Sequence, residues 1–359
     1  MGQDTDEKTV KCVVWDLDDT LWNGVLAEES VALRPDAIEV VKSLDSRGIL
    51  QSVASRNDHE PAMAQLVSFG LADYFLVPQI NWGPKSASVR TIADRLNIGL
   101  DTFAFVDNEP FEREEIGFTH PTVLLLDGAA PLMDVLDLSC MKPRFITEDS
   151  KRRRLMYGED FARRAAEESF EGPPEAFLAT LDMRLCIAPV AQDDLRRVEE
   201  LTERTHQLNS TGYTYSYEDL DRLRLSPDHL LLVADLEDRF GRYGRIGLVL
   251  VERRPECWML KLLIVSCRVM SRGVGSILLQ DVMRRARGAG ARLQAELRDT
   301  GRNRVMNVTY RFAGFQPIEE VGDIMIFEHD LRQIPGVPGY VMLRSVDDEL
   351  DAGAAPVPA

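Results

Sequence analysis

The segment from Val10 to Leu26, VKCVVWDLDDTLWNGVL, constrains this chain more than any other part of its sequence. A continuous apolar run from Cys12 to Trp15 predicts a strand that is buried on both faces of a parallel sheet. In open α/β sheets the chemistry gathers beyond the carboxyl ends of the strands. The acids Asp16 and Asp18, which follow the run directly, are therefore expected at the active edge of such a sheet.

This pair of carboxylates suits phosphoryl transfer once the chain has left the strand and the two side chains converge. Asp16 is the candidate nucleophile toward phosphorus, and Asp18 is the candidate acid and base for the leaving and attacking oxygens. Because two neighbouring acids repel each other, a hard cation such as Mg²⁺ is expected between them. Read alone, the same residues also fit a surface acidic turn.

The chain from Val31 to Asp127 alternates between helical and strand patterns. Helices are predicted over 35–47, 58–69 and 86–96, and strands over 49–54, 74–77, 102–106 and 123–126. The first of these helices places Ile38, Val41 and Leu44 on one face, and Gly48 ends it. Strands that alternate with helices predict an α/β domain with a doubly wound parallel sheet.

Three further polar residues, Ser55, Lys85 and Asp107, each lie at the end of a predicted strand or the start of a helix, as Asp16 does. In a phosphatase a hydroxyl holds phosphoryl oxygens, a lysine offsets their charge, and another carboxylate binds the metal. Taken singly, each residue fits a helix cap, a solvated lysine or a turn acid equally well. Their order and context together favour the phosphatase interpretation.

The motifs around these residues carry a resemblance to a known family. DLDDT at 16–20, Ser55 in VASRND, Lys85 in WGPKSASVRTIADRLNI and Asp107 in FVDNEPFEREE resemble the haloacid dehalogenase (HAD) superfamily of aspartyl phosphatases. With the later THQLNSTGYTYS, they look more narrowly like the FkbH-like glyceryl transferase/phosphatases, over roughly residues 10–330.

The resemblance implies a role for each matching residue. Asp16 would accept the phosphoryl group and Asp18 would act as acid and base. Thr20 and Ser55 would contact phosphate, Lys85 would clamp its charge, and Mg²⁺ would be bound by Asp16, Asp18 and Asp107. Asn108 stands where the family often has a second acid. The segment between Asp18 and Ser55 leaves room for no more than a minimal cap.

After Asp127 the organisation changes. We expect a HAD-like domain over 1–147, a linker helix within 148–174, a second domain over 175–332 and a flexible tail over 333–359. Consecutive strands followed by a strand, a glycine-bearing turn, a helix and a strand predict an α+β class for the second domain. The order of its elements resembles the GNAT acetyltransferase fold.

A glycine loop carries this second resemblance. In GNAT proteins a Gln/Arg-x-x-Gly-x-Gly/Ala loop at a helix N-terminus grips the pyrophosphate of coenzyme A. Gly273 and Gly275 match that motif, whereas Met270 stands at its Gln/Arg position. A phosphopantetheine arm on a carrier protein has one phosphate and would need a weaker grip. Arg268, Gly273 and Gly275 are the predicted contacts for such an arm.

Cys267 lies just beyond a predicted strand, beside this loop. A thiol there can become a nucleophile if the helix N-terminus, Arg268 or an imidazole stabilises its thiolate. His206, in ERTHQLNSTG, is the candidate partner. From the residues alone, Cys267 also fits a small buried packing residue and His206 a structural histidine. The FkbH-like resemblance implies that Cys267 is the acyl-accepting thiol.

By that resemblance the protein would take glyceryl from 1,3-bisphosphoglycerate, remove its phosphates and load it onto an acyl carrier protein for a polyketide extender unit. The alternatives are a plain phosphomonoesterase with an accessory binding domain and a noncatalytic carrier-binding module.

A net charge of −17 disfavours nucleic acid or an anionic membrane as the main partner. No apolar run is long enough to span a membrane, no signal peptide is recognisable, and five scattered cysteines fit a cytoplasmic location.

Overall fold

Strand β1 (Cys12–Trp15) lies at the centre of a five-stranded parallel sheet, and all four of its side chains are buried. The chain moves outward from β1 through β4 to β5, then returns to add β6 and β7 on the other side of β1. This gives the doubly wound order β5-β4-β1-β6-β7. The outer strands are β4 (Leu50–Ser55), β5 (Gln79–Ile80), β6 (Phe103–Asp107) and β7 (Leu124–Asp127).

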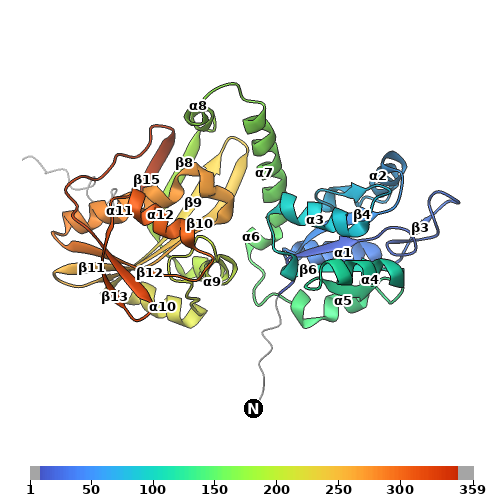
Figure 1. Ribbon diagram of the computed structural model, residues 1–359, viewed down its shortest axis with the longest axis horizontal. Coiled ribbons are helices and arrows are strands. Elements are labelled where there is room, and N and C mark those ends of the chain that lie inside the picture. Colours follow the sequence, from blue (N-terminus) through green and yellow to red (C-terminus); the bar gives the residue numbers. More distant parts are fainter. Residues whose placement is uncertain (1–8, 347–359) are drawn as a thin grey trace, which may run out of the picture. The chain divides into compact units, whose positions relative to one another are not determined.

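Helices connect these strands (Figure 1). They are α1 (Ala37–Ser46), α2 (His59–Ser68), α3 (Lys85–Leu96) and α4 (Pro110–Thr119), and α5 (Met133–Asp137) and α6 (Glu148–Lys151) follow β7. Short 3-10 turns lie at Ala72–Tyr74, Leu100–Thr102 and Ser139–Met141. Between β1 and α1 the chain adds only the two-stranded β2 (Trp22–Asn23) and β3 (Ala32–Leu33), in agreement with a minimal cap.

Two local predictions in this part of the chain are wrong. Ile38 is 37% exposed, because α1 buries Val40 and Val41 with Leu44 instead. The strand predicted over 74–77 does not form: Tyr74 ends the 3-10 turn Ala72–Tyr74, and a single bridge joins Phe75 to Gln51.

This computed structural model describes residues 9–346, which form two compact units that divide between Glu159 and Asp160. The division falls within α7 (Arg153–Glu168), inside the segment expected to form a linker helix. Each unit has its own hydrophobic core, with Trp15, Leu17 and Trp22 among the fully buried residues of the first.

The second unit is built on an eight-stranded mixed sheet in the order β13-β14-β12-β11-β10-β9-β8-β15. Its strands are β8 (Met183–Pro189), β9 (His229–Asp238), β10 (Gly241–Arg253), β11 (Cys257–Val265), β12 (Arg292–Arg298), β13 (Gln316–Val321), β14 (Ile324–His329) and β15 (Val341–Ser345). Its helices are α8 (Pro174–Ala179), α9 (Leu195–Arg204), α10 (Tyr217–Leu225), α11 (Val274–Gly288) and α12 (Arg304–Phe312), with 3-10 turns at Gln192–Asp194 and Cys267–Arg272. The predicted fold class, a parallel α/β unit followed by an α+β unit, is confirmed.

The predicted flexible tail over 333–359 needs correction in its described part. β15 pairs in parallel with β8, from Val341 opposite Met183 to Ser345 opposite Ile187. Val341 and Ser345 are buried, so this strand has a packed face despite the Pro and Gly residues that precede it. Residues 347–359 lie outside the described part of the chain.

Strands β11 and β12 pair in parallel only from Cys257 to Leu260, although both strands continue. Beyond Leu260 the backbone groups of both strands form hydrogen bonds with a segment near residue 210. The amide of Ser210 donates to Leu263 O at 3.0 Å, and the amide of Arg298 donates to Ser210 O at 3.0 Å. A loop from the THQLNSTG motif therefore fills the gap where the two strands separate.

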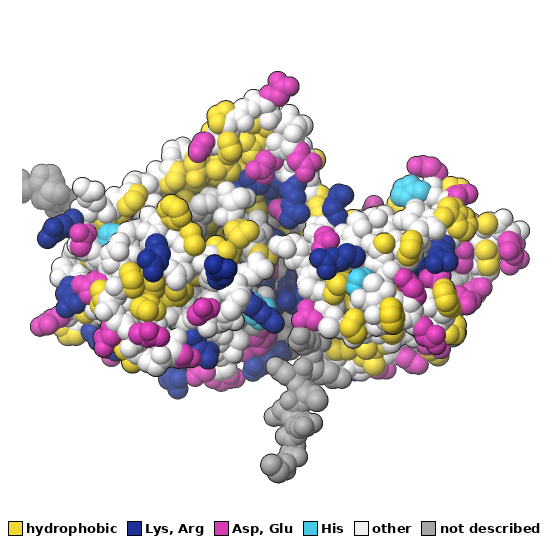
Figure 2. All heavy atoms as spheres, viewed as in Figure 1, with side chains coloured by type: hydrophobic (Ala, Val, Ile, Leu, Met, Phe, Trp, Pro, Cys, Tyr) yellow, Lys and Arg dark blue, Asp and Glu magenta, His cyan; other side chains and the backbone are white. Residues whose placement is uncertain are grey.

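The surface carries charge of both signs. On the face shown in Figure 2, acidic and basic side chains are interspersed. Among the helices of residues 9–346, none combines the length and the apolar character needed to cross a bilayer.

Candidate functional site

Three charged side chains meet at the carboxyl edge of the first sheet. Lys85, the first residue of α3, places its Nζ 2.8 Å from Asp16 Oδ1 and 2.6 Å from Asp107 Oδ2. The two acids lie side by side because they follow or end adjacent strands, with Trp15 paired to Val106. All three residues are at least 95% buried. The sequence prediction that these residues come together is thus realised in the structure.

Burial sets the electrostatics of this cluster. It raises the pKa of Asp16 to about 6 from its usual 3.8, although Lys85 lowers it and the charge of Asp107 raises it again. Burial also raises the pKa of Asp107, against the effect of Lys85. For Lys85, burial acts to lower the pKa, but the two carboxylates together raise it above its usual value. The lysine therefore remains a cation between two acids that compete for it.

The carboxylate of Asp18 is held by three donors. Its Oδ1 accepts from the indole of Trp22 at 2.8 Å and from the amide of Leu26 at 3.1 Å, while its Oδ2 accepts from Asn57 Nδ2 at 2.8 Å. The chain turns sharply after it, because Asp19 has a φ of 50°, in the left-handed region that Asp tolerates better than most residues. Asp18 is consequently fixed between the loops that follow β1 and β4.

Asn57 was not singled out from the sequence. It is buried in the loop after β4, two residues beyond Ser55 in the motif VASRND. Its place in that motif was the available signal, but its bond to Asp18 depends on how the two loops approach each other. Ser55 itself ends β4 as a buried residue on the strand next to β1, which agrees with its expected position at the same edge.

Thr20, which the resemblance implies as a phosphate contact, is paired with Asn108 in this structure. Its hydroxyl donates to Asn108 Oδ1 at 3.1 Å and accepts from the amide of Asn108 at 3.2 Å. The side chain is fully buried, so this reciprocal pair locks the loop after β1 to the loop after β6. Asn108, at the position where a second acid was expected from the resemblance, is the partner in that lock.

The predicted three-carboxylate metal site is corrected. Within residues 9–346, no group of three or more His, Cys, Asp or Glu side chains is arranged to hold a metal ion. The Asp18 carboxylate is directed to Trp22, Leu26 and Asn57, so it does not complete a set with the other two acids. Asp16 and Asp107 remain suitable, because Mg²⁺ commonly binds one or two carboxylates and fills its other positions with water and substrate oxygens. The raised pKa values of both acids reflect burial that a divalent cation would offset.

In the second unit, Cys267 and His206 are both exposed. Cys267 follows β11 and begins the 3-10 turn Cys267–Arg272. The segment of His206 runs beside it, because the amide of Val265 donates to Leu208 O at 2.9 Å. Cys267 and His206 are thus each two residues along the chain from this hydrogen bond between the two backbones. This exposure excludes the alternative reading of Cys267 as a small buried packing residue.

Gly273 and Gly275 line a pocket with Val265, Met270, Ser276 and Thr309 among other residues. Gly273 has a φ of 74° and immediately precedes α11, so a residue with a Cβ atom would be strained at this turn. Of the described residues, neither Cys267 nor Arg268 is among those that line the pocket. The two glycines of the predicted pantetheine contacts thus share one pocket, and the third predicted contact, Arg268, lies outside its lining.

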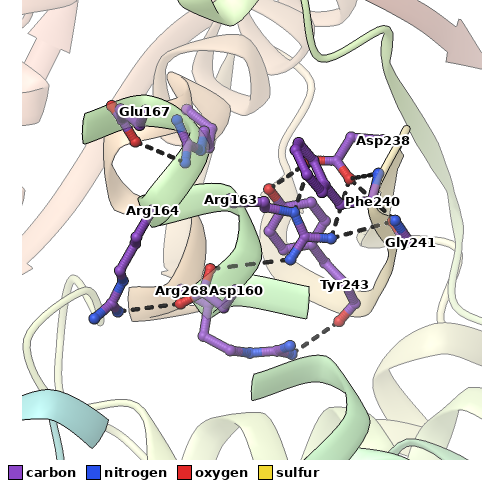
Figure 3. Close-up of polar contacts among 10 residues, drawn as sticks. Asp160, Arg163, Arg164, Glu167, Asp238, Phe240, Gly241, Tyr243 and Arg268 are labelled. Atoms are coloured by element: carbon purple, nitrogen blue, oxygen red, sulfur yellow. Dashed lines mark hydrogen bonds and ion pairs between the residues drawn. The ribbon is translucent and has the colours of Figure 1, made fainter. Parts of the chain in front are cut away.

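Arg268 belongs to a separate polar cluster, shown in Figure 3. Its guanidinium donates to the carbonyl of Tyr243 at 2.8 Å. Beside it, Arg163 of α7 binds Asp238 through Nε at 2.8 Å and lies over the ring of Tyr243, 3.8 Å from its centroid. Tyr243 also donates its hydroxyl to Asp238 at 2.9 Å. This cluster ties α7 and the turn that carries Cys267 to strand β10, and Arg268 has a structural contact within it.

No protein-family model matches the chain, and no curated protein matches it. Among solved structures, it is similar to the N-terminal part of the protein BF1531 from Bacteroides fragilis, which contains a phosphatase domain complexed with Mg, with 29% identity and a TM-score of 0.35. That match covers 38% of this chain and 42% of the other, so the chain spans less than half of that protein's length.

Two further similar structures are acetyltransferases. The GNAT domain of a Streptomyces lividans protein has 21% identity and a TM-score of 0.33, over 40% of this chain and 88% of that one. The PaiA N-acetyltransferase of Thermoplasma acidophilum, in complex with coenzyme A, has 17% identity and a TM-score of 0.32, over 40% of this chain and 98% of that one.

Proposed function

We propose that the first unit hydrolyses phosphate esters with Asp16 as the nucleophile. The observation that carries this proposal is the buried contact between Asp16 and Lys85, which sets an ammonium beside the attacking carboxylate. A carboxylate oxygen of Asp16 forms a bond to phosphorus while the bond from phosphorus to the leaving oxygen breaks, and Asp18 gives that oxygen a proton. Water then attacks the aspartyl phosphate, Asp18 takes the proton from the water, and Asp16 is regenerated.

Asp16 and Asp107 would hold Mg²⁺, which when bound neutralises charge on the phosphoryl oxygens. Lys85 contributes to the same neutralisation from the protein side, and Ser55 is the proposed hydroxyl contact to phosphate. Such a site suits an unactivated phosphate ester, whose uncatalysed hydrolysis is among the slowest reactions known.

We further propose that the second unit carries an acyl group on Cys267. Its thiolate would form a bond to the acyl carbon of 1,3-bisphosphoglycerate while the carbon–oxygen bond to phosphate breaks. His206 would accept the thiol proton and pass it to the departing phosphate. The thiol of an acyl carrier protein would then attack this thioester and lose its proton to the neutral His206, which would pass it to the departing Cys267 thiolate. The exposure of Cys267 and its place beside the Gly273 loop support this step.

Taken together, the proposed activity is that of an FkbH-like glyceryl transferase/phosphatase, which would load glyceryl onto a carrier protein for a polyketide extender unit. Intact-mass analysis after incubation with Mg²⁺ and 1,3-bisphosphoglycerate tests it. A glyceryl or phosphoglyceryl adduct is expected on the wild type and on Cys257→Ala, and is expected to disappear in Cys267→Ala and on addition of the carrier. An adduct that persists in Cys267→Ala would refute the assignment.

One observation favours a second candidate, a phosphomonoesterase whose second unit only binds its substrate. Residues around Ser210 already form hydrogen bonds with the backbone of β11 and β12 beyond Leu260, where a pantetheine arm would otherwise bind. Arg268 is likewise already hydrogen-bonded, to the carbonyl of Tyr243. In that case phosphate release would need no carrier protein, and Cys267→Ala would release phosphate at the wild-type rate.

A further inference from the structure

An ion pair joins the two segments that follow the neighbours of strand β1, the strand that ends just before Asp16. Arg56 follows the last residue of β4, and Glu112 is in the first turn of α4, just after β6. Because β4 and β6 are the two neighbours of β1, their following loops meet at the end of β1. Arg56 Nη1 is 3.2 Å from Glu112 Oε1, so the pair joins the segment after β4 to the start of α4, the segments that flank the one after β1.

The two members of the pair differ sharply in exposure. The side chain of Arg56 is 41% exposed, whereas that of Glu112 is 9% exposed. Among the described residues, Glu112 Oε2 is buried and has no hydrogen-bond partner. A buried carboxylate oxygen without a donor costs free energy, which distinguishes this pair from an ordinary surface salt bridge.

Glu112 also acts on the cluster below it. Burial is the main reason that the pKa of Asp107 is raised, and the charge of Glu112 adds to that shift. The pair thus lies close to Asp107, and the guanidinium of Arg56 is the member that remains exposed to solvent.

We infer that Arg56 is a specificity-determining residue that binds a second anionic group of the phosphorylated substrate, and that Glu112 positions Arg56. The substrate class is a small phosphate ester with a carboxylate or second phosphate. This inference rests on the proposed phosphatase function. In the proposed reaction the acyl phosphate supplies the second charge, so Arg56 would recognise the substrate before the thioester forms.

Two matched probes test it. 3-Phosphoglycerate has a carboxylate where glycerol 3-phosphate has a hydroxymethyl group, and both carry hydroxyls. We expect Arg56→Gln to lower the ratio of their kcat/KM values by about 10-fold to 100-fold, since a charge-assisted hydrogen bond is lost. Arg56→Lys should keep most of the preference. Glu112→Gln should lower the ratio less, mainly through KM for 3-phosphoglycerate. Arg90→Gln, which removes an exposed arginine on α3, is the control and should leave the ratio unchanged.

The outcomes separate the inference from the function on which it rests. If Arg56→Gln lowers both kcat/KM values equally, or neither, the inference is overturned. If the wild type hydrolyses neither probe, the phosphatase proposal fails, and calorimetric binding of both probes to Asp16→Asn then decides about Arg56. If adding Arg56→Gln to Asp16→Asn leaves the ratio of the Kd values for the two probes unchanged, the inference about Arg56 is also overturned.

Discussion

Lys85 Nζ lies 2.6 Å from Asp107 Oδ2 and also contacts Asp16, so one ammonium holds together two acids that come from different strands. Without it the two carboxylates would face each other in a site that excludes water. Breaking a buried pair by removing one partner is strongly destabilising, because the charge left behind is uncompensated.

Lys85→Met is therefore expected to lower phosphate release by about 100-fold or more, since an electrostatic contact to the phosphoryl group is lost. It should also lower the free energy of unfolding of the first unit by about 3 kcal/mol at pH 8. The fluorescence of the buried Trp15 and Trp22 reports that transition. Lys142→Met, at an exposed pair with Asp137, is the control and should change stability by less than about 0.5 kcal/mol. Wild-type activity in Lys85→Met would contradict the proposed site.

Asp16→Asn should stabilise the first unit at pH 8 in the presence of EDTA. The folded pKa of Asp16, about 6, is above its usual 3.8, so its contribution to stability is full below pH 3.8 and is lost as pH rises through about 6. Asparagine lacks this dependence. Urea unfolding should show an advantage of about 1–3 kcal/mol for the variant at pH 8 and a smaller one at pH 4.5. Mg²⁺ should reduce this difference in unfolding free energy between variant and wild type at pH 8, because it stabilises the wild type. A difference that grows toward low pH would contradict the raised pKa of Asp16.

The Arg163–Asp238 pair is expected to matter for the second unit, because both side chains are almost fully buried. Arg163→Met leaves the Asp238 carboxylate with only neutral donors, at a cost of about 3–5 kcal/mol in that unit's unfolding free energy. The fluorescence of Trp258 and hydrogen exchange in β9 would measure it. Arg184→Met removes an arginine from an exposed pair with Glu237, the residue next to Asp238, and should have little effect.

Cys267 should react first with a thiol reagent in the native protein. It is exposed, whereas Cys12 and Cys140 are buried and Cys186 and Cys257 are partly buried. Peptide mapping after brief treatment with iodoacetamide should find label at Cys267 before any other site, and at Cys12 only after unfolding. Faster labelling of Cys257 than of Cys267 would argue against the proposed acyl-carrying role.

The sequence predicted the charged cluster well because parallel strands bring their carboxyl ends to one edge. Asp16 and Asp107 meet for that reason, and Lys85 reaches them because α3 begins at that edge. The direction of the Asp18 side chain could not be predicted in this way. It depends on the left-handed turn at Asp19 and on a bond to Asn57, and neither follows from strand order.

The second unit shows the same limit. Gly273 and Gly275 were found because a turn before a helix has a local signature. The insertion of Ser210 between β11 and β12 rests on hydrogen bonds between residues more than fifty positions apart, which no local pattern encodes. β15 was missed because the Pro and Gly residues before it outweighed the short alternating pattern of Val341 and Leu343.

The pairing of β15 with β8 has a practical consequence for anyone who shortens this chain. A fragment that stops at residue 332 would expose the outer backbone groups of β8, and unpaired edge strands recruit other chains. Such a fragment is expected to aggregate during purification, whereas one that ends at residue 346 retains the protecting strand.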